Sequence, residues 1–103
     1  MLMRANIAEV KVEYPHGSYF DGFICQQLKE FLEKNGLYIY SMENSDGGAE
    51  QWEIEKDSLE DFLEDWDSYE FKMYGCTKDE MKEFLEKLLK SNKGQNCCFV
   101  HWF

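Results

Sequence analysis

Residues 29–34 read Lys-Glu-Phe-Leu-Glu-Lys, and residues 82–87 repeat the same six residues in the same order. In both copies an apolar pair lies between charged residues, which is typical of an amphipathic helix that buries one face. We therefore predict one helix over about 19–35 and another over about 77–91. Strand-like segments precede and follow each copy, so the repeat indicates helices that pack on a shared sheet.

Alternating or continuous apolar residues predict the strands around these helices. The five predicted strands cover residues 7–14, 37–43, 52–55, 69–73 and 97–103. The second strand is apolar or aromatic on both faces, which favours a central position in the sheet. Turn-forming residues at 44–48 connect it to the third strand, so these two strands are expected to form an antiparallel hairpin.

A third helix is predicted between the third and fourth strands. Asp57 and Ser58 are expected to cap it, and its buried stripe consists of Leu59, Phe62, Leu63 and Trp66. The element order is then β-α-β-β-α-β-α-β, and its two split β-α-β halves resemble the ferredoxin-like arrangement. We therefore expect an α+β fold in a single domain over residues 1–103, a ferredoxin-like variant of the two-layer α/β sandwich with a mainly antiparallel sheet.

Negative charge is concentrated in one part of the chain. The sequence holds 21 Asp and Glu against 11 Lys and Arg, a formal charge of −10. Residues 43–70 contain 12 of these acids and a single base, Lys56, whereas the remaining residues are nearly neutral. Phosphates are bound by Lys and Arg, so this balance argues against direct nucleic-acid binding and favours a basic protein partner.

The acids of the middle helix are expected on its outer face, opposite the apolar stripe. Several of them lie one turn apart, and like-charged neighbours at that spacing destabilise a helix by about 0.2–0.5 kcal/mol per pair. Such a surface fits partner binding, although a solvated face that keeps the protein in solution is the simpler interpretation. The candidate partner-binding residues are Glu53, Glu55, Asp57, Glu60, Asp61, Glu64, Asp65 and Asp67.

These features favour a non-enzymatic acidic binding protein that inhibits or neutralises a basic, nucleic-acid-handling protein such as a nuclease. In one form, spaced carboxylates mimic a nucleic-acid backbone, as in small phage-encoded inhibitors of the restriction or CRISPR nucleases of phage defence. In the other, the protein is an immunity protein or antitoxin. The likeness lies in the charge pattern alone, because the sequence contains no family motif.

A second hypothesis rests on aromatic residues of the strands. If all helices cover one face of the sheet, the opposite face is expected to present Tyr38 and Tyr40 together with Trp102. Aromatic sheet faces stack on RNA bases in some modules, but basic residues are missing here. A regulatory or accessory domain that forms a homodimer or binds a protein through this face is therefore the alternative function.

Metal, cofactor and catalytic sites are not predicted. Cys97 and Cys98 are neighbours on a strand and point to opposite faces, so they are poorly placed to share one metal ion. A calcium loop aligned on Gly47 would place Met42 at the first ligand position. The two histidines occur without a recognisable nucleophile motif. We expect no enzyme activity.

The sequence also predicts the compartment. No apolar run is long enough to span a membrane, and the first residues do not resemble a secretory signal. Four cysteines in such a chain favour thiols in a reducing environment, so we expect a cytoplasmic protein.

Overall fold

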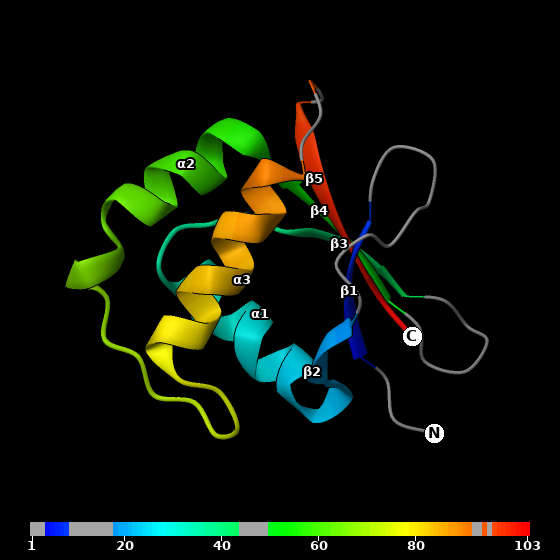
Figure 1. Ribbon diagram of the computed structural model, residues 1–103, viewed down its shortest axis with the longest axis horizontal. Coiled ribbons are helices and arrows are strands. Elements are labelled where there is room, and N and C mark those ends of the chain that lie inside the picture. The colour runs from blue at the N-terminus through cyan, green and yellow to red at the C-terminus, as the bar shows by residue number, and fades with distance from the viewer. Residues whose placement is uncertain (1–3, 9–17, 44–49, 92–93, 95) are drawn as a thin grey trace.

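The helices of the computed structural model lie on the same side of a five-stranded β-sheet (Figure 1). The structure describes residues 4–8, 18–43, 50–91, 94 and 96–103. Within them the α+β class predicted from the sequence is confirmed. The strands are β1 (Arg4–Ala8), β2 (Ser18–Asp21), β3 (Tyr40–Glu43), β4 (Glu50–Glu55) and β5 (Cys97–Trp102); the α-helices are α1 (Cys25–Lys34), α2 (Lys56–Glu64) and α3 (Lys78–Lys90), with 3₁₀ turns η1 (Gly22–Ile24) and η2 (Trp66–Ser68).

Neighbouring strands of the sheet are all antiparallel, and their order is β2-β1-β5-β4-β3. The strand β5 is therefore central, and His101 lies between Asn6 of β1 and Gln51 of β4. The predicted hairpin is confirmed as the β3–β4 pair. The predicted ferredoxin-like element order is not found, because the described chain runs β-β-α-β-β-α-α-β.

The first difference lies at the start of the predicted first helix. Residues 18–21 form the edge strand β2 instead, which pairs with β1 in a register that sets Asp21 opposite Arg4. An ion pair of 3.5 Å between Arg4 and Asp21 accompanies this pairing. Ser18 is therefore a strand residue and not a helix cap. Of the first predicted strand, residues 9–14 lie outside the described residues.

The second difference concerns residues 69–73, which were expected to form a strand and instead follow η2 without joining the sheet. Their aromatic side chains pack against the helices. Phe71 meets Phe31 of α1 edge-on with ring centroids 5.0 Å apart, and Tyr69 stacks on Phe62 of α2 at 4.6 Å. Apolar and charged residues do alternate in this segment, but its apolar side chains pack against helices and not within a sheet.

The predicted central strand at 37–43 is also reassigned. Only Tyr40–Glu43 form β3, and β3 lies at the edge of the sheet. Leu37 and Ile39 are buried, whereas Tyr38 is 70% exposed. The aromatic residues that suggested two buried faces are therefore partly on the surface, which an edge position permits because one side of the strand has no neighbour in the described sheet.

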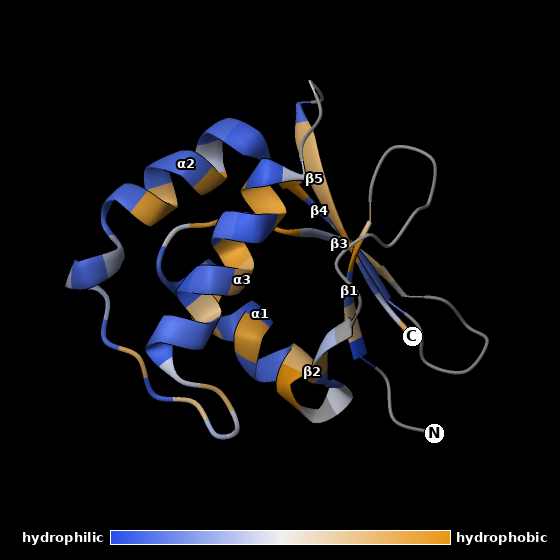
Figure 2. Ribbon diagram, in the orientation of Figure 1, coloured by the Kyte–Doolittle hydropathy of each residue, from blue (hydrophilic) through white to orange (hydrophobic). Residues whose placement is uncertain are grey.

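The core lies between the sheet and the helices, where apolar faces of both layers meet (Figure 2). The sheet contributes alternate residues from its three central strands: Ala5, Ile7, Trp52, Ile54, Cys98, Val100 and Trp102. The charged faces of the helices point away from it. Each described helix is short and amphipathic, and none of them has the length and apolar character needed to cross a membrane.

The repeated hexapeptide occupies equivalent places in α1 and α3. Its apolar residues Phe31, Leu32, Phe84 and Leu85 are all buried, as the sequence predicts. The start of α3 is fixed by the predicted capping box. The Glu80 backbone N–H donates to Thr77 Oγ1 at 3.1 Å, and the Thr77 backbone N–H donates to Glu80 Oε1 at 2.9 Å.

Replacement of Phe84 by alanine should lower the free energy of unfolding by about 3–5 kcal/mol. Phe84 is 1% exposed, and its ring makes edge contacts with Tyr19 and Phe20 of β2. The change therefore leaves a cavity where α3 meets an edge strand. Urea unfolding measures the effect, with Glu86→Ala on the exposed face of α3 as the matched control. Equal stabilities of the two variants would contradict this packing.

Candidate functional site

The acidic helix α2 begins directly at the end of β4. Glu55 occupies the cap position with an extended backbone, and the Lys56 backbone N–H donates to the Asn96 carbonyl at 2.9 Å. The expected cap by Asp57 and Ser58 is wrong, because both residues lie inside the first turn. Asp57 is nevertheless well placed there, since a negative charge near a helix N-terminus interacts favourably with the helix dipole.

Burial divides α2 and η2 into two faces, as the sequence predicts. Leu59, Phe62 and Trp66 are buried, and Leu63 is half-buried. On the other face every candidate acid of these elements is exposed. With the two acids from β4, the exposed set comprises Glu53, Glu55, Asp57, Glu60, Asp61, Glu64, Asp65 and Asp67, which we call the acidic surface.

Little positive charge from the described residues neutralises the acidic surface. Glu60 pairs with Lys56 one turn earlier, at 3.9 Å between the side-chain atoms. Among the residues that the structure describes, the other seven carboxylates have no Lys or Arg within ion-pair distance. Burial raises the pKa of Cys97 on β5, and the negative charges of Glu53 and Glu55 add to this effect.

Glu50 differs from these acids, although it belongs to the same segment of the sequence. Its side chain is 12% exposed and lies 3.7 Å from the ammonium of Lys29 on α1. The Cys25 thiol donates to the same carboxylate at 3.1 Å, and Lys29 also donates to Ser41 Oγ at 2.7 Å. These contacts connect α1 to the β3–β4 hairpin. Sequence reasoning missed them because the residues involved are far apart in the chain.

The aromatic interface expected on the sheet needs a correction. Trp102 is fully buried, and its ring lies 5.1 Å from that of Trp52 in the core. The alternation of β5 points residue 102 toward the helices, on the face opposite Tyr40. Tyr38, which precedes β3, is exposed, as are Tyr40 and Met42 on this edge strand, so the exposed aromatic group is smaller than expected and lies at one edge.

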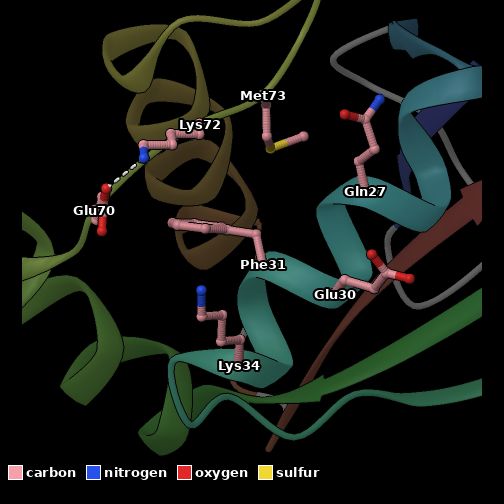
Figure 3. Close-up of a pocket in the computed structure, with 7 residues that line it drawn as sticks. All are labelled: Gln27, Glu30, Phe31, Lys34, Glu70, Lys72 and Met73. Atoms are coloured by element: carbon pink, nitrogen blue, oxygen red, sulfur yellow. Dashed lines mark ion pairs between the residues drawn. The ribbon is translucent and has the colours of Figure 1, made fainter.

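A surface hollow of about 280 Å³ lies between α1 and the segment after η2 (Figure 3). Phe31 and Met73 line it together with Lys34, Glu70 and Lys72. Glu70 and Lys72 form an ion pair of 2.9 Å, and this contact lowers the pKa of Glu70. Acidic and basic groups balance here, so the hollow does not extend the acidic surface.

The four cysteines are thiols, three of them buried and Cys97 half-buried. Among the described residues, no three His, Cys, Asp or Glu side chains gather in a way that could hold a metal ion. Gly47, on which the calcium loop was aligned, lies outside the described residues. Comparison with protein-family models, with curated proteins and with solved structures finds no match for the chain.

Alkaline pH should destabilise the protein through Cys76. Burial and the nearby charge of Glu80 raise the pKa of this thiol from 9.0 to about 11. The folded state therefore disfavours the thiolate. The resulting contribution to stability is complete below the pKa of the unfolded chain and is lost as the pH rises toward the folded value.

The measurement is urea unfolding of the wild type and of Cys76→Ala at several pH values from 8 to 11. The difference in unfolding free energy between the two proteins should shrink across this range. A difference that stays constant would show that Cys76 does not titrate in this way.

Proposed function

We propose that this chain is a non-enzymatic binding protein that inhibits or neutralises a basic, nucleic-acid-handling protein through its acidic surface. The observation that carries the proposal is the separation of charge between the helices. On α3, Glu83 pairs with Lys87 at 3.1 Å, and acids alternate with bases along the helix. On the exposed face of α2, acids follow one another without such compensation after Lys56.

The fold does not require this separation. The buried stripe of α2 supplies its packing, so any polar residues would serve on the outer face. Neighbouring carboxylates repel one another along the helix, which makes the arrangement slightly unfavourable in the isolated protein. A basic partner offsets this repulsion, because each carboxylate then lies near positive charge. Such complementarity mainly raises the rate and specificity of association.

A partner that handles nucleic acid fits the surface better than a generally basic one. Its own site is built to receive a row of phosphates, which carry one negative charge each. The exposed carboxylates of α2 and η2 follow one another along the outer side of the helical layer, while Glu53 and Glu55 of β4 add charge on the face of the sheet opposite the core. In this proposal the chain occupies the phosphate-binding groove of its partner and excludes the nucleic acid.

Neutralising part of the acidic surface should abolish binding without loss of fold. The variant combines Glu60→Gln, Asp61→Asn, Glu64→Gln and Asp65→Asn, which keep side-chain size and remove charge. We expect its melting temperature to stay the same or rise slightly, because repulsion along α2 is relieved. Capture of the partner from the native host should fall, and the captured protein should bind the wild type less tightly as salt is added.

The matched control removes four acids elsewhere, through Glu30→Gln, Glu33→Gln, Glu83→Gln and Glu86→Gln on α1 and α3. It has the same formal charge as the test variant but keeps the acidic surface. Unchanged affinity and salt dependence in the test variant would contradict the proposal. Equal losses in both variants would show that only total charge matters.

The second candidate function is a regulatory or accessory domain that binds another protein or a second copy through the edge strand β3. The exposed side chains of Tyr38, Tyr40 and Met42 favour it, because edge strands with exposed apolar residues readily pair with other strands. Binding of this kind depends on packing and backbone hydrogen bonds, so it should be nearly independent of salt.

A charge introduced into β3 by substitution distinguishes the two candidate functions. Tyr40→Lys should weaken any association through the edge strand, because a lysine at an exposed edge opposes strand pairing. It should leave association through α2 unchanged. Sedimentation velocity over a range of protein concentrations measures self-association, and Tyr74→Lys, at an exposed tyrosine outside the sheet, controls for the same change of charge. A wild type that stays monomeric would exclude the homodimer.

A further inference from the structure

A second hollow lies within the acidic surface, lined by residues from the end of α1, the loop after it and α2. Its volume is about 260 Å³. Most small-molecule sites are larger, at about 300–1,000 Å³, so this hollow suits one side chain of a partner better than a whole ligand. It is lined by Asn35, Gly36, Ser58, Asp61, Phe62, Asp65 and Tyr69.

The hollow combines negative charge with an aromatic surface. Asp61 and Asp65 lie one helical turn apart and are both exposed. Tyr69 stacks on Phe62, so its ring is held in place from within the protein. Burial and the charge of Asp65 raise the pKa of Tyr69, which agrees with a carboxylate close to this ring.

Backbone dipoles add to this negative potential. The helix α1 ends at Lys34 with Asn35 as its cap, and α2 ends at Glu64 with Asp65 as its cap. Helix C-termini carry partial negative charge, and both of these ends border the hollow. The residues that line it include carboxylates, an amide and a hydroxyl but neither Lys nor Arg.

The other side of α2 offers a contrast. A hollow between α2 and α3 is lined by Glu60, Glu64 and Glu86, but also by Lys90. A base of the chain itself therefore contributes to that lining, and Lys56 pairs with Glu60. The two sides of α2 thus differ in their lining: a lysine lines the hollow on the Glu60–Glu64 side, whereas neither Lys nor Arg lines the hollow on the Asp61–Asp65 side.

We infer that the hollow between α1 and α2 receives an arginine side chain of the basic partner, with its guanidinium between the Asp61 and Asp65 carboxylates and the Tyr69 ring. This inference rests on the proposed function and specifies how the acidic surface recognises its partner. Arginine fits better than lysine because its flat guanidinium stacks on aromatic rings and donates paired hydrogen bonds to carboxylates.

The test uses fluorescent oligoarginine and oligolysine peptides of equal length as probes, at low salt. Both carry the same charge, so any preference between them reports the shape of the cation. We expect the wild type to bind oligoarginine about fivefold more tightly than oligolysine. Asp61→Asn with Asp65→Asn should remove this preference. Glu60→Gln with Glu64→Gln removes the same charge and should weaken both peptides alike while keeping the preference.

Variants of Tyr69 test the aromatic part. Tyr69→Phe keeps the ring and should keep the preference for arginine, whereas Tyr69→Leu should lose it. Melting curves show whether each variant is folded. If Tyr69→Leu is unfolded, the Asp61→Asn, Asp65→Asn double variant still tests the inference. Equal binding of both peptides by the wild type would overturn the inference.

Equal effects of the two double variants would overturn it as well, but would leave the acidic surface as the binding site. If neither double variant weakens oligoarginine binding, the acidic surface itself is not the site of cation recognition. The proposed function then fails together with the inference.

Discussion

The packing of Trp52 against Trp102 joins the two halves of the sheet. The two rings lie 5.1 Å apart on β4 and β5 and are both fully buried. Their indole N–H groups find no hydrogen-bond acceptor among the described residues, so the pair is held by apolar contact alone. The adjacent inner-face residues Ile7 and Val100 continue this contact across to β1, and the helices close over it.

Local sequence patterns predicted those elements whose partners are determined by local chemistry. The capping box at Thr77, the apolar stripe of α2 and the repeated hexapeptide all lie where they were expected, because helix periodicity is a property of consecutive residues. The errors concern residues whose partners are distant. Residues 69–73 alternate like a strand but pack on Phe31, and 18–21 look helical but pair with β1.

The candidate site shows the same division. Exposure of the acids could be predicted, because each lies opposite the apolar residues of its own helix or strand. The neutralisation of Glu50 by Lys29 and the hollow beside Asp61 could not, since both depend on how α1 lies against the rest of the fold. The burial of Trp102 was missed because the sequence does not specify which face of β5 the helices cover.

The central position of β5 has a consequence for how the chain folds during synthesis. The hairpins β1–β2 and β3–β4 emerge from the ribosome before the strand that joins them, and the pairing of Ala5 in β1 with Trp102 in β5 spans 97 positions. Contacts of such long range form slowly. Until β5 arrives, one side of β4 is an open edge, and Glu53 and Glu55 place charge along it. Charge along an open strand edge opposes pairing with other chains, which disfavours aggregation while that edge is uncovered.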